Sequence, residues 1–347
     1  MKRVKPALLA FLLAVAIAAT GATALAEAAE TGTPAETAAD TPVGRNGQLA
    51  VCGVKLCNAS GTPIQLRGVS THGTQWYGQC VNDASLDALA GDWGADVLRV
   101  STYVQEDGYE TDPEHFTNLA HEYIEKATAR GMYVIVDWHM LDPGDPHENL
   151  ESARTFFTEI ATRHAAKNNV LYEVANEPSG VSWTRLREYH EAIIPVIRAL
   201  DADAVVLAGT RAWSSLGLSE DGDETEVADD PVNAANIMYT FHFYAASHDD
   251  YYLDGLTRAA ERIPMFVTEF GTQEYTGDGP NDFGMSQRYL DLMAEKQISW
   301  VNWNYSDDFR SGAAFTTGTC PGGPFAGPTR LKPAGAWIRE QIQEGTA

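Results

Sequence analysis

The stretch Val-Leu-Tyr-Glu-Val-Ala-Asn-Glu-Pro-Ser-Gly, residues 170–180, decides the fold, because an apolar run ends there abruptly in a carboxylate. The stretch Pro-Met-Phe-Val-Thr-Glu-Phe-Gly, residues 264–271, repeats this form. Continuous β-prone runs of this length are typical of strands buried on both faces, as in a parallel sheet. We therefore expect Glu177 and Glu269 at the ends of two such strands, half shielded from water at the rim of one core.

Similar apolar runs recur along the chain, and stretches rich in Ala, Leu, Glu and Arg separate them, for example residues 118–130, 152–167 and 183–200. Strands that alternate with helices over about 280 residues predict an α/β fold, a single (β/α)8 TIM barrel, here with a short N-terminal hairpin. A doubly wound open sheet is the alternative, but its glycine-rich nucleotide loop is missing after the first strand. The eight expected strands are 65–70, 97–101, 133–138, 170–175, 204–208, 237–241, 265–269 and 300–303.

The first residues have the form of a targeting segment. A basic start at residues 2–5 precedes an apolar run at residues 7–19, and Ala-Leu-Ala at 24–26 is a small-x-small cleavage site. This pattern predicts a signal peptide over residues 1–26 and a secreted, extracellular protein. A membrane anchor is the alternative, and the apolar run is short for one.

The rest of the chain divides into a tether and one domain. Residues 27–45 contain Ala, Thr, Glu and Pro without aromatic residues, which predicts a disordered tether. Residues 46–345 suffice for one barrel domain. The whole chain has 48 acidic and 24 basic side chains, a formal net charge of −24. This charge argues against nucleic acid and membrane surfaces as partners and suits a neutral polymer, and we expect a monomer.

Four cysteines in a secreted chain predict two disulfides, for which three pairings are possible. Cys52 and Cys57 flank an expected hairpin, where opposed residues approach within bonding range. Cys80 follows the first barrel strand and Cys320 the eighth, and these strands are neighbours only in a closed barrel. We therefore expect Cys52 to pair with Cys57, and Cys80 with Cys320. Zinc is the alternative, but the spacing is wrong and no pair of histidines accompanies the cysteines.

Polar and aromatic side chains gather where the expected strands end, which is the face of a barrel that carries function. A polar group in an apolar run costs stability unless it is paired or used, so a whole set at one rim indicates a site. Flat aromatic rings there suit the apolar faces of sugars, although Trp183 fits the core equally well. The candidates are His72, Trp76, Arg99, Tyr103, His139, Asn176, Trp213, His242, Tyr244 and Trp303.

Glu177 and Glu269 are the residue types that glycosidic bond cleavage needs, one protonated acid and one ionised carboxylate. A free Glu is ionised at neutral pH, so we expect burial and the neighbouring carboxylate to raise the pKa of Glu177. We expect Arg99 and Tyr244 to keep Glu269 ionised. This chemistry needs no cofactor and no metal. The acidic loop at 139–148 lacks the dense oxygen ligands and glycine turn of a calcium loop.

The chain carries six motifs in the order Arg-Gly-Val-Ser-Thr-His-Gly (67–73), Val-Asp-Trp-His (136–139), Glu-Val-Ala-Asn-Glu-Pro (173–178), Tyr-Thr-Phe-His-Phe-Tyr-Ala-Ala-Ser-His (239–248), Val-Thr-Glu-Phe-Gly (267–271) and Trp-Val-Asn-Trp-Asn (300–304). In this order they resemble the cellulases of glycoside hydrolase family 5, especially its secreted bacterial endo-β-1,4-glucanases. The resemblance spans residues 48–343, and the combination is far more specific than any one motif.

The resemblance implies a retaining mechanism through a covalent glycosyl-enzyme, with Glu177 as acid/base and Glu269 as nucleophile. It implies a β-glucan polysaccharide as substrate, cleaved at internal β-1,4 bonds of cellulose or mixed-linkage glucan. Related enzymes often carry a lysine where this chain has Asp308, so the sugar contact of that lysine stays open, with Arg310 as the candidate replacement.

The resemblance also assigns subsites to the aromatic and polar candidates. It implies that His72, Trp76 and Tyr103 line the non-reducing side and that Trp213 contacts sugar near the cleavage point. The reactive subsite would be lined by Arg99, His139, Asn176, His242, Tyr244 and Trp303.

Two other functions remain as alternatives. A β-mannanase or xylanase uses the same barrel, because specificity lies in loops and a few hydrogen bonds. A non-catalytic carbohydrate-binding protein would keep the aromatic residues and lose a carboxylate, whereas both carboxylates are present here.

Overall fold

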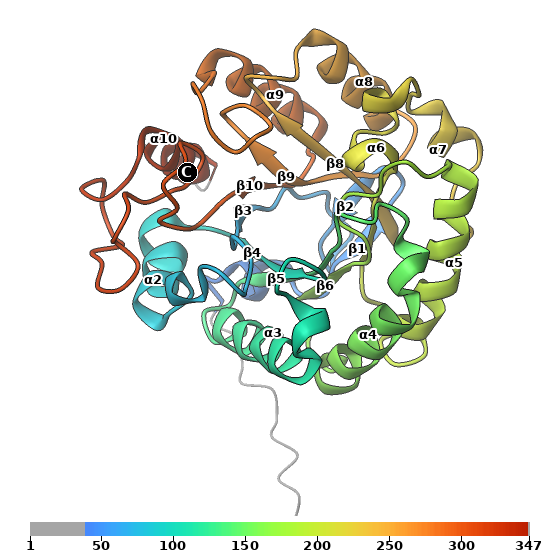
Figure 1. Ribbon diagram of the computed structural model, residues 1–347, viewed down its shortest axis with the longest axis horizontal. Helices are drawn as coiled ribbons and strands as arrows, with labels where there is room; N and C mark the ends of the chain where they lie inside the picture. Colours follow the sequence, from blue (N-terminus) through green and yellow to red (C-terminus); the bar gives the residue numbers. More distant parts are fainter. Residues whose placement is uncertain (1–38, 346–347) are drawn as a thin grey trace, which may run out of the picture. The chain divides into compact units, whose positions relative to one another are not determined.

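Parallel strands close into a barrel in the computed structural model, which describes residues 39–345. The barrel strands are β3 (Arg67–Ser70), β4 (Val97–Tyr103), β5 (Tyr133–His139), β6 (Val170–Glu173), β7 (Val206–Ala208), β8 (Ile237–Tyr244), β9 (Met265–Gly271) and β10 (Trp300–Trp303). They follow one another around the ring in chain order, and β10 pairs with β3 to complete it (Figure 1). All eight overlap the expected strands, so the predicted (β/α)8 barrel is confirmed.

Helices run along the outside of the ring between successive strands (Figure 1). Local sequence sets their starts: Pro113 opens α3, and the Asp112 side chain accepts a hydrogen bond from the backbone N–H of His115. The α-helices here are α2 (Asp83–Ala88), α3 (Pro113–Thr128), α4 (Leu150–His164), α5 (Trp183–Arg198), α6 (Arg211–Ser214), α7 (Thr225–Asp229), α8 (Asp250–Ala260), α9 (Phe283–Lys296) and α10 (Pro333–Glu344). Short turns form η1 (Gly78–Cys80), η2 (Leu89–Trp93), η3 (Tyr109–Thr111), η4 (Pro146–Asn149) and η5 (Leu218–Glu220).

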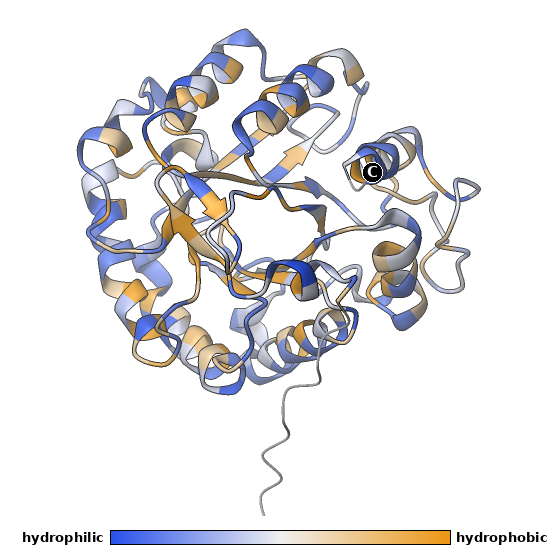
Figure 2. Cartoon of the chain, turned by 180° about the vertical axis from the view of Figure 1, so that it is seen from behind, coloured by the Kyte–Doolittle hydropathy of each residue, from blue (hydrophilic) through white to orange (hydrophobic). Residues whose placement is uncertain are grey.

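The strands are apolar on their outer face and change character along their inner face. Alternate residues of a strand point to opposite sides, so one set packs against the helices and the other fills the barrel. Figure 2 shows the apolar strands within helices of mixed hydropathy. Near the start of the strands the interior holds an apolar layer: Val97, Tyr133, Ile135, Leu171, Leu207, Met238, Phe266 and Val301. Two residues further along β4, β5 and β6, and on β9, it holds a charged layer: Arg99, Asp137, Glu173 and Glu269.

The N-terminal part of the described chain closes the apolar end of the barrel. Helix α1 (Pro42–Asn46) buries Val43, and the hairpin of β1 (Ala50–Cys52) and β2 (Lys55–Cys57) buries Leu56, both against the apolar layer. Helix α1 thus lies where the last residues of the tether were predicted, and that part of the prediction was wrong. The apolar contact of Val43 explains the difference. The predicted signal peptide and the rest of the tether lie outside the described residues.

The helices and Trp183 answer two further questions that the sequence raised, about a membrane span and about the sugar-binding rim. None of the helices within residues 39–345 combines the length and apolarity that a membrane span needs. Trp183, which suited the rim and the core equally well, is buried at the start of α5, where its indole N–H donates to the Asp230 carbonyl at 2.8 Å. Trp183 therefore belongs to the core.

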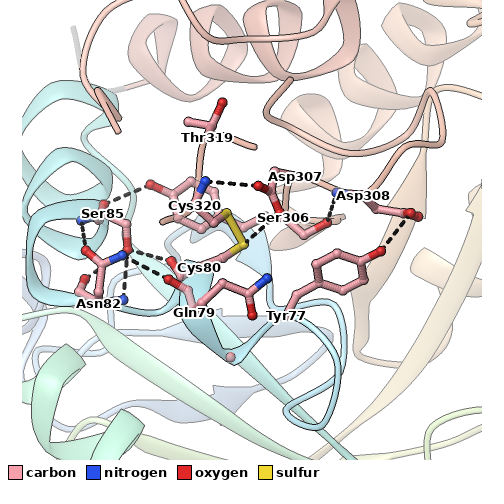
Figure 3. Close-up of a disulfide and its surroundings, with 12 residues drawn as sticks. Tyr77, Gln79, Cys80, Asn82, Ser85, Ser306, Asp307, Asp308, Thr319 and Cys320 are labelled. Atoms are coloured by element: carbon pink, nitrogen blue, oxygen red, sulfur yellow. Dashed lines mark hydrogen bonds between the residues drawn. A yellow bond between two sulfur atoms is a disulfide. The ribbon is translucent and has the colours of Figure 1, made fainter. Parts of the chain in front are cut away.

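Two disulfides join Cys52 to Cys57 and Cys80 to Cys320, the pairs expected from the sequence. The second connects η1, after β3, with the loop after β10, across a sequence separation of 240 (Figure 3). In the same loop the backbone N–H of Cys320 donates to Asp307 Oδ2 at 3.0 Å. The bridge therefore ties together two loops at the carboxyl end of the barrel.

Candidate active site

Glu177 and Glu269 face each other at the carboxyl ends of the strands. Glu177 follows β6, where its backbone N–H donates to the Met140 carbonyl, and Glu269 lies in β9. A carboxylate oxygen of each lies within 4.8 Å of the other and of a ring nitrogen of His242. The Glu269 side chain is 5% exposed and that of Glu177 is 14% exposed, so both are shielded but reachable from the cleft.

Arg99 of β4 is the centre of the charged layer. Its guanidinium donates through Nε to Glu173 Oε2 at 2.6 Å, through Nη1 to Glu269 Oε2 at 2.9 Å, and through Nη2 to Asn176 Oδ1 at 2.6 Å. Asp137 Oδ2 lies 3.0 Å from Nη2. The planar fork of arginine suits several carboxylates at once. Arg99 and Asn176 are fully buried, so they act from below the cleft.

Glu269 is held as an ionised carboxylate. Its second oxygen, Oε1, accepts a hydrogen bond from the Tyr244 hydroxyl at 2.6 Å. Burial alone would raise its pKa, but the positive charges of His242 and Arg99 and the Tyr244 hydrogen bond outweigh burial and lower the pKa of Glu269. An ionised carboxylate held by fixed donors is ready to act as a nucleophile.

Glu177 has the opposite electrostatic character. Burial raises its pKa above the ordinary value, and the charge of Glu269 acts in the same direction, while the hydrogen bond with His242 opposes it. His242 Nδ1 lies 2.9 Å from Glu177 Oε1. Two neighbouring carboxyl groups with pKa values pushed apart are the mark of an acid and a nucleophile.

His139 and Trp303 form the floor of the cleft beside the carboxylates. Their rings are stacked with centroids 5.2 Å apart. His139 Nδ1 lies 2.6 Å from Asp137 Oδ2. Burial and the charge of Arg99 hold the pKa of His139 well below its usual range, so the imidazole is neutral. The Asn176 amide donates through Nδ2 to His139 Nε2 at 3.4 Å, so the single ring hydrogen is on Nδ1, which faces Asp137. A neutral ring of fixed orientation presents the same face to every ligand.

Two cavities meet at the carboxylates and share Glu177, Tyr244 and Tyr275 in their walls. The first has a volume of about 300 Å³ and is lined by, among others, His72, Trp76, Tyr103, His139, Glu269, Trp303, Asp308 and Arg310. The second has a volume of about 410 Å³ and is lined, besides the shared residues, by Trp213, Ser215, Ser219, His242 and His248. The predicted site residues therefore converge on one cleft, with Arg99 and Asn176 beneath it.

Trp213 is presented to the second cavity by an unusual backbone. Ala212, Trp213 and Ser214 all have left-handed φ angles of 60°, 57° and 53°, which cost on the order of 1–3 kcal/mol each outside glycine. Hydrogen bonds to the residues on either side of Glu177 offset this cost. The Trp213 N–H donates to the Pro178 carbonyl at 2.9 Å, and Ser214 Oγ donates to the Asn176 carbonyl at 2.6 Å. Trp213 is 46% exposed. The hydrogen bonds fix its side chain beside Glu177 in the wall of the second cavity.

The far end of the first cavity contains a cluster around Asp308. Its Oδ1 accepts from the Tyr77 hydroxyl at 2.8 Å, and its Oδ2 pairs with Arg310 Nη1 at 2.9 Å (Figure 3 shows the Tyr77 bond). The His72 ring stacks on Tyr77 with centroids 4.8 Å apart. Asp308 is buried, whereas the Arg310 side chain is 41% exposed and lines the cavity. Arg310 is thus the positively charged side chain that lines this cavity, close in the chain to the position where related enzymes often carry a lysine.

Several residues of the site escaped the sequence analysis, among them Glu173, Thr268 and Tyr275. Glu173 and Thr268 lie within apolar strand runs, where the sequence does not show whether a polar side chain points into the barrel or toward the helices. Tyr275 lies in the loop after β9, is 70% exposed, and stands between the two cavities. The alternation of side chains along a strand could not have indicated Tyr275, because Tyr275 lies beyond the end of β9.

Within residues 39–345, two groups of side chains gather closely enough to hold a metal ion. One is Cys80, Cys320 and Asp307, whose sulfurs are joined in a disulfide. The other is Glu177, His242 and Glu269, in which His242 already uses Nδ1 toward Glu177 and Nε2 toward Thr268. Neither set leaves the converging free donors that a metal site requires.

Comparison with known proteins agrees with this geometry. The family described as Cellulase (glycosyl hydrolase family 5) matches residues 57–309. Endoglucanase E-5 from Thermobifida fusca is 62% identical over 304 residues, which are 87% of this chain and 65% of that protein. Endoglucanase CelA from Streptomyces lividans is 54% identical over 305 residues, which are 88% of this chain and 66% of that protein. The chain thus spans less than two thirds of the length of these relatives.

Solved structures give the same relationship. The crystal structure of the catalytic domain of the Thermobifida fusca endoglucanase has a TM-score of 0.86 and 62% identity, and the match covers 87% of this chain and 99% of that chain. Another structure of that domain, with the same TM-score of 0.86, is a complex with cellotetraose. The fold and site define a (β/α)8 barrel glycoside hydrolase. The chain belongs to glycosyl hydrolase family 5.

Proposed function

We propose that the protein is a retaining endo-β-1,4-glucanase that hydrolyses internal bonds of cellulose or mixed-linkage β-glucan. The pair Glu177 and Glu269 carries this proposal, because their carboxylate oxygens lie within 4.8 Å of each other. This distance suits the separation of about 5–5.5 Å in retaining enzymes and is too short for the roughly 6.5–9.5 Å of inverting ones. The relatives named endoglucanases support the choice of substrate.

In the first step Glu269 attacks the anomeric carbon of the sugar at the cleavage point. The bond from that carbon to the leaving oxygen breaks with its electron pair on the oxygen, which takes the proton of Glu177. Arg99 and Tyr244, which hold the two oxygens of Glu269, fix the attacking carboxylate in place. The product is a glycosyl ester of Glu269 and a shortened chain with a free hydroxyl.

In the second step water attacks the same carbon and its proton passes to Glu177, which now acts as a base. Esterification removes the negative charge of Glu269, a charge that raises the pKa of Glu177 in the free enzyme. The pKa of Glu177 therefore falls when it must accept a proton. Breaking the ester restores the ionised carboxylate of Glu269.

The two cavities supply subsites on either side of this bond. His72, Trp76 and Tyr103 lie on the side that we assign to the non-reducing sugars, with Arg310 as the replacement for the lysine of related enzymes. Trp213 lies on the other side, as a platform next to the cleavage point. Trp76 is 39% exposed and Trp213 is 46% exposed, which suits stacking on sugar rings. The cellotetraose complex of a relative supports a β-1,4-glucan in this cleft.

We further propose that the protein is secreted and acts as a monomer without a cofactor. Both disulfides suit an oxidising compartment. A signal peptide over residues 1–26 and a tether from residue 27 would precede the barrel domain, which extends to residue 345.

Product analysis tests the proposed function. The enzyme is incubated with carboxymethylcellulose, barley β-glucan, galactomannan and xylan, and the first products are followed by proton NMR. We expect shorter oligosaccharides from the two glucans, released first as the β-anomer. Faster hydrolysis of galactomannan or xylan would favour the mannanase or xylanase alternative. Release of the α-anomer first would exclude retention, and binding without hydrolysis would indicate a carbohydrate-binding protein.

A further inference from the structure

The proposed mechanism leaves unexplained two polar side chains in the barrel interior. Glu173 of β6 and Thr268 of β9 are both fully buried, so neither can touch a sugar. A buried charge or hydroxyl costs stability unless it is paired. Here Glu173 and Thr268 bond to each other and lie between Arg99 and His242, directly behind the acid Glu177.

The hydrogen bonds fix which nitrogen of His242 carries a proton. Burial opposes ionisation of Glu173, but the charge of Arg99, whose Nε donates to Oε2 at 2.6 Å, outweighs it and lowers the pKa of Glu173. An ionised carboxylate only accepts, so the Thr268 hydroxyl donates to Glu173 Oε1 at 2.7 Å. The lone pairs of Thr268 then accept from His242 Nε2 at 2.9 Å. His242 Nε2 therefore carries a hydrogen.

The other nitrogen of His242 faces the acid. Nδ1 lies 2.9 Å from Glu177 Oε1. Burial would lower the pKa of His242, but its interactions with Glu173 and Glu177 and the charge of Glu269 prevail and raise the pKa of His242 to about 9. At neutral pH both ring nitrogens thus donate, one to Thr268 and one to Glu177 Oε1. The acid proton of Glu177 is then left on its other oxygen, Oε2.

We propose that Thr268 and Glu173 are positioning residues for the acid step, which they control through His242. They hold His242 so that Nδ1–H is donated to Oε1 of Glu177, and Oε2 is the oxygen that delivers the proton to the leaving group. This inference rests on the proposed role of Glu177 as the acid. A neutral His242 would instead accept a hydrogen bond at Nδ1 from protonated Glu177, which would turn the acid proton away from the leaving oxygen.

Other groups near His242 also affect its charge, so a test must leave them unchanged. The charged and titratable groups around it are Arg99 on β4, Asp137 and His139 on β5, Glu173 on β6, Glu177 after β6, and Glu269 on β9. Thr268→Val keeps all of these charges and the branched shape of the side chain and removes only the hydroxyl. Thr268→Ser is the matched control, because it keeps the hydroxyl and removes the methyl group.

The first measurement is an NMR titration of the histidine nitrogens in 15N-labelled protein, with His242 assigned by the His242→Gln variant. In Thr268→Val we expect the pKa of His242 to fall below its wild-type value, because the cation loses a hydrogen-bond partner while the neighbouring carboxylates remain. In Thr268→Ser we expect it to stay alkaline. An unchanged pKa in Thr268→Val would overturn the inference.

The second measurement compares leaving groups. In Thr268→Val we expect kcat/KM on barley β-glucan to fall about 10- to 100-fold, and that on dinitrophenyl β-cellobioside, which needs no acid, by less than about threefold. Thr268→Ser should keep the wild-type ratio of the two substrates. Equal losses on both substrates, or a serine variant that matches the valine variant, would indicate a packing role and overturn the inference. Failure of the wild type to hydrolyse any glucan would instead overturn the proposed function, and the acid-step role with it.

Discussion

The two layers of side chains inside the barrel are built on the same strands and stabilise the protein in different ways. Strand β6 contributes Leu171 to the apolar layer and, two residues later, Glu173 to the charged layer. Full burial of a leucine contributes about 1.5–3 kcal/mol, largely independent of which apolar neighbour it meets. A buried group of charges contributes little as a whole, yet removal of one partner costs about 3–5 kcal/mol.

The comparison shows that charge in a barrel interior is acceptable only as a set. Arg99 faces the carboxyl groups of Asp137, Glu173 and Glu269. Each contact with the guanidinium replaces a hydrogen bond that the carboxyl oxygen would make to water in the unfolded chain. The apolar layer can lose a methyl group without changing its neighbours' protonation. In the charged layer the loss of one group changes the protonation of its neighbours, because each charge shifts the pKa of the groups beside it. We expect mutations in the two layers to differ accordingly.

The largest effect expected is on activity, from the two carboxylates. Glu269→Gln should lower kcat/KM by about 10⁴-fold or more on every substrate, because the nucleophile is lost, and azide should not restore activity. Glu177→Ala should lose about 10²- to 10⁴-fold on β-glucan but retain activity on dinitrophenyl β-cellobioside, with azide accelerating release of the glycosyl-enzyme. The reverse pattern in steady-state kinetics would exchange the two roles.

The next effect is on stability and depends on pH. The folded-state pKa values of Glu173 and Glu269 are lowered, so their contribution to stability is present above the unfolded value near 4.3 and is lost as pH falls through the folded value. Arg99→Gln should therefore lower the free energy of unfolding by about 3–5 kcal/mol at neutral pH. The deficit relative to the wild type should shrink toward about pH 4, as the unpaired carboxylates become protonated.

Leu171→Ala is the matched control from the apolar layer. It should cost about 2–5 kcal/mol through lost burial and a cavity, with no dependence on pH because no charge is removed. Urea unfolding of both variants at neutral and acidic pH measures the contrast. A deficit of Arg99→Gln that stays constant with pH would mean that the charged layer stabilises as the apolar layer does.

The smallest effect expected is outside both layers, at the exposed Tyr275 in the loop after β9. Tyr275→Ala should raise KM on β-glucan about three- to tenfold with little change in kcat, because a ring between the two cavities contributes stacking of about 0.5–1.5 kcal/mol. Tyr251→Ala is the control, since Tyr251 is 53% exposed on α8 and lines neither cavity. Equal KM values for the two variants would remove Tyr275 from the binding surface.

The apolar layer and the strands could be predicted from the sequence more fully than the charged layer. Continuous apolar runs located every barrel strand, and the polar residues that ended those runs located Glu177, His242 and Glu269. The disulfide between Cys80 and Cys320 followed from barrel closure. These features depend on periodicity and on chain order, both of which are visible in one sequence.

The missed features depend on contacts between distant segments. Thr268 and Glu173 lie 95 residues apart in the chain, and their hydrogen bond requires the strand positions of the closed barrel. Helix α1 formed where composition indicated a tether, because the Val43 side chain packs against the apolar layer and the Val43 N–H donates to the Gly131 carbonyl at 3.0 Å. The left-handed backbone at Trp213 has no glycine to announce it. Local patterns carry no information about such partners.

The bond between Cys80 and Cys320 makes the chain between them a covalent ring that includes every barrel strand from β4 to β10. A ring that is cut once stays in one piece. A protease that nicks any single rim loop between these cysteines would therefore leave both fragments attached, with their new ends free but the seam between β3 and β10 still joined. In a medium that contains proteases, this ring would have to be cut twice, or reduced and cut once, before any of the strands from β4 to β10 could leave.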